Sequence, residues 1–111
     1  MKIINLTPHA IHFMDKEGSV LTTIQPSGTV ARAKQTRVQV GIMSVGEANI
    51  PINQSSYGEV EGLPAPEDGT VYIVSALTAQ AVPDRNDVFI TDDAVRDAEG
   101  RIIGCRALAH I

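Results

Sequence analysis

The chain has 111 residues, 43% hydrophobic and 20% charged, a balance that excludes an intrinsically disordered protein and predicts one domain spanning residues 1–111. Nine Lys and Arg against 13 Asp and Glu give a net charge of −4, which argues against binding to extended nucleic acid. Aromatic residues make up only 4% and Trp is absent, so we expect a core of Val, Ile, Leu and Ala.

Short apolar segments with β-branched residues alternate with Gly, Pro and Asp turns along most of the chain. Only one interval has a helical pattern, and it begins at a capping Ser75 and ends before Pro83. The sequence therefore predicts a mainly β fold, a small antiparallel barrel or sandwich with one short helix at residues 75–82. The expected strands cover residues 2–6, 10–14, 20–24, 29–33, 37–40, 50–52, 71–74, 88–90 and 101–109.

Three local expectations accompany this fold. Residues 44–49 are predicted to form a turn, followed by an edge strand at 50–52, because Pro51 cannot donate a hydrogen bond to a neighbouring strand. Residues 55–69 are rich in Gly, Pro and acidic side chains and are predicted to form a surface loop. In the helix, Ala76, Leu77 and Ala81 are expected to face the sheet.

The protein is expected to be cytoplasmic. The first residues lack the long apolar core of a signal peptide, and no apolar run is long enough to span a membrane, so no membrane partner is expected. Cys105 is the only cysteine, which excludes an intrachain disulfide and favours a reducing compartment. We expect Cys105 to be a buried, unreactive thiol.

No catalytic residue, metal site or cofactor is predicted. His9 and His12 are three residues apart in an expected strand, so they point to opposite faces and make poor joint ligands of a metal. The Asp residues lie in turn-like contexts, where Asp is favoured because it bonds its own backbone. Neither a nucleophile elbow nor a phosphate-binding glycine loop is present. A small hydrolase nevertheless stays open as an alternative.

Arginine provides the strongest indication of binding, because six of the nine basic residues are Arg. Its guanidinium pairs bidentately with carboxylate or phosphate groups. The predicted ligand-binding residues are Arg85 and Asn86, in the turn after the helix, with Arg106 and Arg32 from apolar strands and Tyr72 as a stacking ring. The alternative interpretation is that each Arg pairs internally with an Asp of the same chain.

Four segments carry a resemblance to a known family: INLTPHAI, PSGTVARA, VYIVSALTAQAVPDRNDV and VRDAEGRIIGCRALAHI. Together they resemble a family of small uncharacterised proteins of bacteria, prophages and phages, and the resemblance covers nearly the whole chain. It implies a cytoplasmic, accessory role, in the host cytoplasm if the protein is encoded by a phage. It implies no established activity and no catalytic residues.

The first functional hypothesis is a non-enzymatic binder of a small anionic or nucleotide-like ligand. By analogy with other phage sponge proteins, such a binder would sequester a nucleotide immune signal. The alternative is an oligomeric structural or interaction protein, for example a virion-associated or accessory protein. We expect a homo-oligomer, with the Pro51 strand and the 55–69 segment as candidate contact regions.

Overall fold

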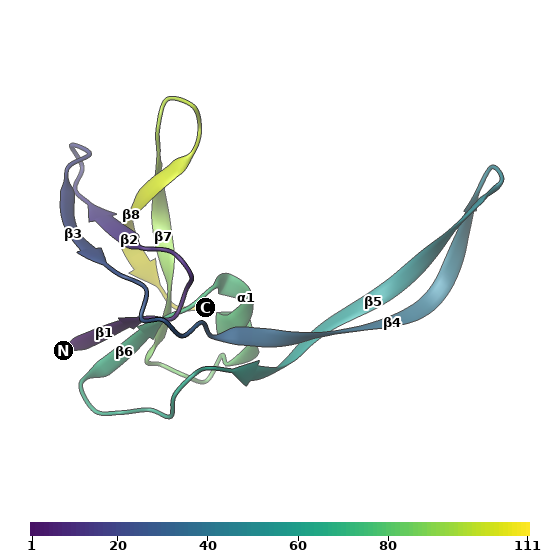
Figure 1. Ribbon diagram of the computed structural model, residues 1–111, viewed down its shortest axis with the longest axis horizontal. Coiled ribbons are helices and arrows are strands. Elements are labelled where there is room, and N and C mark those ends of the chain that lie inside the picture. Colours follow the sequence, from purple (N-terminus) through teal and green to yellow (C-terminus); the bar gives the residue numbers. More distant parts are fainter.

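The computed structural model describes residues 1–111 and shows a β-rich body from which one long hairpin projects (Figure 1). Its radius of gyration is 17.9 Å and its longest extent is 55 Å, whereas a compact chain of this length has a radius of gyration of roughly 13 Å. The protein is mainly β with one short helix, as predicted. Its elements are β1 (Lys2–Asn5), β2 (Ile11–Met14), β3 (Val20–Ile24), β4 (Arg32–Val45), β5 (Ala48–Glu61), β6 (Thr70–Ile73), α1 (Ala76–Ala81), β7 (Val88–Arg96) and β8 (Ile102–Ala109).

Six strands form the sheet of the body, in the order β1-β6-β7-β8-β2-β3. The antiparallel pairs are the hairpins β2–β3 and β7–β8. The pairs β1–β6, β6–β7 and β2–β8 are parallel, and α1 lies in the crossover between β6 and β7. The sheet curls until its two end strands approach each other at a bridge between Asn5 and Pro26. The result is a partly closed, barrel-like body.

Asn5 holds this closure together from inside. Its side chain is 1% exposed, and its amide nitrogen donates to the backbone oxygens of His9 at 2.7 Å and Ile24 at 3.1 Å. Its amide oxygen accepts from the backbone and the hydroxyl of Thr7. Because a buried amide is costly unless its groups are bonded, these contacts fix the ends of β1 and β3.

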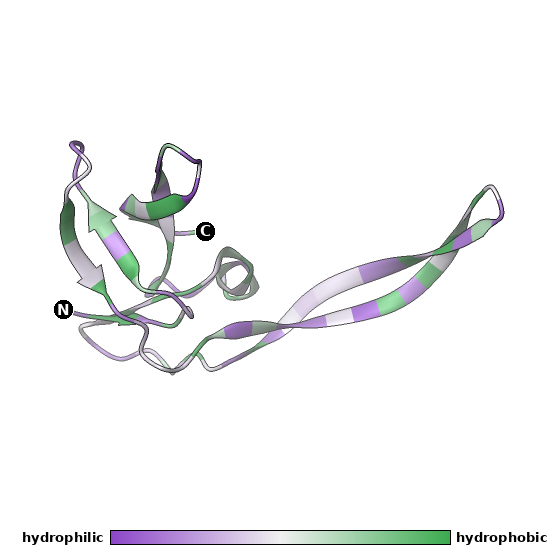
Figure 2. Ribbon diagram, turned by 45° about the horizontal axis from the view of Figure 1, so that its top comes forward, coloured by the Kyte–Doolittle hydropathy of each residue, from purple (hydrophilic) through white to green (hydrophobic).

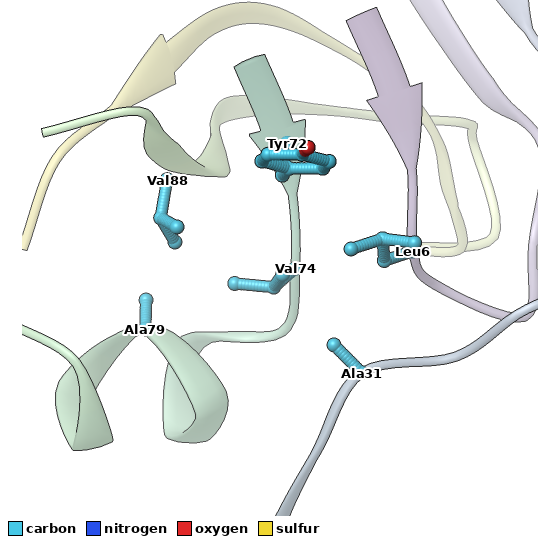
Figure 3. Close-up of a cluster of buried hydrophobic side chains, with 6 residues drawn as sticks. All are labelled: Leu6, Ala31, Tyr72, Val74, Ala79 and Val88. Atoms are coloured by element: carbon cyan, nitrogen blue, oxygen red, sulfur yellow. The ribbon is translucent and has the colours of Figure 1, made fainter. Parts of the chain in front are cut away.

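The main core lies between the sheet and α1 (Figure 3). Tyr72 lies in β6 and Val74 directly follows that strand, while Val88 comes from β7 and Ala79 from the helix (Figure 3). Apart from Tyr72 the side chains are aliphatic, in keeping with the composition. The complete cluster consists of Leu6, Ala31, Tyr72, Val74, Ala79 and Val88.

The helix begins and ends as predicted, but it presents a different face to the core. Ser75 is the N-cap, and its hydroxyl accepts a hydrogen bond from the backbone of Thr78. Thr78 and Ala79 are the buried residues, whereas Ala76 is exposed and Leu77 is 49% exposed. The expectation that Ala76 and Leu77 face the sheet is wrong. Leu77 instead lies beside the base of the β4–β5 hairpin, where it lines a shallow depression with Tyr57.

The β4–β5 hairpin is the feature that departs furthest from the prediction. Each strand has 14 residues, so the hairpin is about 45 Å long at roughly 3.3 Å per residue. The predicted turn at 44–49 shrinks to Gly46 and Glu47, with Gly46 at a φ of +59°, which a two-residue hairpin turn requires. The predicted loop at 55–69 is strand as far as Glu61. We call this hairpin the arm.

Candidate functional site

Arg85 lies in the turn after α1 and is held by an internal ion pair. Its Nε donates to Asp87 Oδ1 at 2.8 Å, and its Nη2 donates to Asp87 Oδ2 at 2.9 Å and to the Pro64 backbone oxygen at 3.0 Å. The hydrogen bond from Arg85 lowers the pKa of Asp87, and the same bond raises the pKa of Arg85. With side-chain exposures of 22% and 14%, the pair anchors the 62–69 segment to the body. An Arg engaged in this way has few donors left for a ligand.

Asn86 lines a cavity of 180 Å³ with Arg85 and the C-terminal residues His110 and Ile111. Small-molecule sites usually enclose about 300–1,000 Å³, so this cavity suits at most a very small ligand. His110 closes one side, because its Nδ1 lies 3.3 Å from the Val88 backbone oxygen.

Arg106 belongs to a separate region of the body. Its Nε donates to the Asp15 backbone oxygen at 3.3 Å, and its Nη1 lies 4.0 Å from Asp93 Oδ1. It therefore links β8 to the tip of the β2–β3 hairpin. Arg106 lines none of the five cavities of the body, and Arg85 and Arg32 line different ones.

Arg32 stands at the start of β4 and makes no ion pair within the chain. It lines a depression of 300 Å³ together with the polar side chains of Thr7 and Ser75 and the apolar side chain of Leu77. Of the predicted ligand-binding arginines, Arg32 is the one with an unpaired guanidinium at a concave surface.

Tyr72 is a core residue. It is 1% exposed, and its hydroxyl donates to the Ala65 backbone oxygen at 3.5 Å. This burial leaves no ring face on which a ligand could stack. Of the five predicted site residues, only Arg85 and Asn86 share a cavity, and Arg32, Arg106 and Tyr72 lie elsewhere in the body.

The groups capable of covalent or metal chemistry are few. Cys105 is buried, as predicted, and burial raises the pKa of its thiol. His12 pairs with the Thr23 hydroxyl at 2.8 Å. No three His, Cys, Asp or Glu side chains gather as a metal site would need. The six-residue α1 falls far short of the length and apolarity of a membrane-spanning helix.

The arm carries a surface that the sequence interpretation missed. Hydrophobic and hydrophilic residues alternate along its outer half (Figure 2). The register pairs Val45 with Ala48, Met43 with Ile50 and Gly41 with Ile52. Because cross-strand partners share a face and successive residues alternate between faces, these residues lie on one side of the ribbon. We call the apolar residues of this side the apolar face: Val38, Gly41, Met43, Val45, Ala48, Ile50 and Ile52. Val38 reaches this side through the bulge between Gln39 and Gly41, and its partner there is the polar Gln54.

The opposite side of the arm is largely polar. The register pairs Ser44 with Asn49, Gln39 with Asn53 and Arg37 with Ser55, and Ile42 and Pro51 form the one apolar pair among them. Its polarity suits contact with water. The arm is thus amphipathic along the half that lies beyond the body.

The apolar face is open. Its five large side chains are between 38% and 59% exposed, and no helix or strand of the body covers the outer half of the arm (Figure 1). The sequence signal was present in the alternation of residues 37–45. It predicts only a short strand, at residues 37–40, because the pairing partner, in residues 48–61, resembles a turn and a loop.

Comparisons of the chain with protein-family models, curated proteins and solved structures found no match.

Proposed function

We propose that this protein is an assembly protein, a self-associating β domain whose arm joins it to other subunits. The observation that supports this proposal is the exposed apolar face at the outer half of the arm. The remainder of the chain folds into a body that makes no use of it. The proposal corresponds to the oligomeric, structural alternative derived from the sequence.

A two-stranded ribbon gains little stability in water unless a further layer covers one of its faces. Each half-exposed Val, Ile or Met leaves on the order of 100 Å² of apolar surface, so the apolar face presents about 500 Å². At about 25 cal/mol per Å², covering it would contribute on the order of 10 kcal/mol per arm before the costs of association. A surface of this size is costly to leave in water, and assembly removes the cost.

Light scattering on the purified full chain tests this proposal. We expect a mass at least twice that of the 11.8 kDa chain at micromolar concentration. Met43→Glu should convert the protein to a monomer because it places a charge in the apolar face. Ser44→Glu, one residue away on the polar face, is the matched control and should leave the mass unchanged. A monomeric wild-type protein across the micromolar range would contradict the proposal.

A second candidate function is the sequestration of a small anionic, nucleotide-like ligand, the first hypothesis from the sequence. The observation that favours it is the unpaired Arg32 at the 300 Å³ depression beside Thr7 and Ser75. The planar guanidinium suits a phosphate, whereas the Thr7 hydroxyl donates to Asn5 and the Ser75 hydroxyl caps the helix.

A panel of nucleotides and cyclic nucleotides tests the second candidate. Binding should raise the melting temperature of the wild-type protein but not of Arg32→Ala, and chromatography should return the ligand unaltered. Altered ligand would instead support the hydrolase alternative. If no compound of the panel changes the melting temperature of either protein, the proposal of ligand binding at this site is wrong.

A further inference from the structure

We infer that the largest cavity of the body binds a small, neutral and mostly apolar molecule that carries one hydrogen-bonding group. The cavity has a volume of 430 Å³, within the range of about 300–1,000 Å³ that is typical of small-molecule sites. It adjoins the Arg32 depression, with which it shares Thr7 and Ser75, but Arg32 does not line it. The inference goes beyond the proposed assembly function and does not rest on it.

The cavity opens where the strand beside β7 ends. β6 pairs with β7 at only two positions, and the second of them joins Ile73 to Phe89. The Val74 N–H still donates to the Phe89 backbone oxygen at 2.9 Å before the chain turns into α1. β7 continues as far as Arg96, so most of the edge that it turns to β6 has no strand beside it. The opening therefore lies at one end of the barrel-like body, a position that small-molecule sites often occupy.

The cavity reaches the buried interior. Ile11, Val74 and Cys105 line it and are buried, while Ile90 is partly buried and Ile102 is exposed at the rim. Protein interiors leave few voids larger than a water molecule. This cavity corresponds to roughly ten to fifteen non-hydrogen atoms at about 30 Å³ each. Its size and its apolar floor suit a compact organic molecule.

The lining excludes a charged ligand. Seven of its eleven residues are hydrophobic, and none is Lys, Arg, Asp or Glu. A charged group moved from water into such a site without a partner would be costly, so the lining favours a neutral molecule.

Two polar side chains at the cavity are free to bind a ligand. The Thr7 hydroxyl already donates to Asn5, and the Ser75 hydroxyl already caps the helix. His9 uses only its backbone oxygen in hydrogen bonds within the chain, and the Thr91 hydroxyl makes none. An imidazole and a hydroxyl can each donate or accept a hydrogen bond. The ligand group that suits them is a hydroxyl, a carbonyl or an amide.

Octanol is a probe of this class, and octanoate and octylammonium are its charged counterparts. Isoleucine-methyl NMR on the full chain reports where a probe binds, because Ile11, Ile90 and Ile102 line the cavity while Ile50 and Ile52 lie on the apolar face of the arm. We expect octanol to shift the cavity methyl signals, but not those of the arm, with a dissociation constant on the order of 100 µM. Each charged counterpart should bind at least about tenfold more weakly.

Two substitutions test the position of the probe. Ala76→Phe should abolish octanol binding, because Ala76 is exposed at the cavity and a ring there would fill the opening. Gln80→Phe, about one turn further along α1 and outside the cavity, is the matched control and should leave the affinity unchanged. Thr91→Val keeps the shape of the side chain but removes its hydroxyl, and it should weaken octanol binding roughly fivefold. It tests the site even if the ring at position 76 disturbs the helix.

Four results would overturn the inference. Octanol could shift no methyl signal up to its solubility limit, or only the signals of the arm. Octanoate or octylammonium could bind as tightly as octanol, which would refute the neutral ligand class. A folded Ala76→Phe protein, or Thr91→Val, could bind octanol with the affinity of the wild type. None of these results depends on the oligomeric state, so failure here leaves the assembly function untouched, and a monomeric protein leaves this inference untouched.

Discussion

The ion pair between Arg85 and Asp87 decides whether the turn after α1 stabilises the fold or binds a ligand. Its two hydrogen bonds are 2.8 and 2.9 Å long, and both side chains are less than a quarter exposed. Hydrogen bonds to charged groups contribute about 1.5–3 kcal/mol each, and partial exposure reduces that value. We therefore expect Arg85→Gln and Asp87→Asn each to lower the free energy of unfolding by about 1–3 kcal/mol.

A double-mutant cycle isolates the pair itself. Unfolding in urea, followed by circular dichroism, should give a coupling energy of about 1–2 kcal/mol between Arg85 and Asp87. The control is Arg101→Gln, because the Arg101 side chain is 73% exposed where it pairs with Asp97 and Glu99. Such an exposed pair should contribute much less to stability than the Arg85–Asp87 pair, because solvent screens it. A coupling below about 0.3 kcal/mol for Arg85 and Asp87 would refute the structural role and return Arg85 to the candidates for ligand binding.

The same pair predicts that the free energy of unfolding depends on pH in the acidic range. The pKa of Asp87 is lower in the folded protein than in the unfolded chain, chiefly because of the hydrogen bond from Arg85. Its stabilising contribution is therefore complete above the unfolded pKa of about 4 and is lost as the pH falls through the folded value. Between pH 7 and pH 3, Asp87→Asn should lose less stability than the wild type. Equal losses would show that the carboxylate is not stabilised by folding.

Three further predictions concern packing. Leu77→Asp should lower the free energy of unfolding by less than about 1 kcal/mol because Leu77 is half exposed. Ala79→Asp should lower it by several kcal/mol because Ala79 is 3% exposed. Thermal melts of both variants check these values. Gly104→Ala should destabilise the body, since its Cβ would lie 2.7 Å from the His12 backbone oxygen, which cannot move aside as the nearby Met14 side chain can. Gly41→Ala, with no atom within 4 Å, should not destabilise the fold. Cys105 should react with a chromogenic thiol reagent only after unfolding; rapid reaction in the native protein would contradict its burial.

Local patterns were sufficient to predict most of the body. The β3 strand lies at 20–24 as expected, and the helix is capped by Ser75 and ends before Pro83. These features depend on hydrophobic alternation and capping, which are encoded in adjacent residues. The face of the helix was predicted wrongly because a six-residue helix has almost no periodicity of its own. The base of the arm, which no local pattern reveals, decides which side Leu77 occupies.

The arm shows where local patterns fail. Residues 53–61 contain Asn, Ser, Gly and Glu, which are typical of a loop, yet they form strand because β4 provides a continuous ladder of hydrogen-bond partners. Whether a segment forms a strand depends also on the segment it pairs with, so the sequence of one segment alone does not reveal it. The ion pair of Arg85 has the same cause. The sequence shows that an Asp lies nearby in the chain, but only the fold sets the distance between the two side chains.

The distribution of apolar residues separates the two parts of the molecule. The core of the body uses side chains from residues 4–31 and 63–108, and none from the outer half of the arm. The large apolar residues of 38–52 therefore contribute little to folding a single chain, although they would expose the chain to aggregation if nothing covered them. Most of them share one face, whereas Ile42 and Pro51 form the one apolar pair of the opposite face, and such an uneven distribution favours a defined contact over a generally sticky surface. Association between chains is the function we propose for this segment, and the oligomeric state is therefore the first property of the protein to measure.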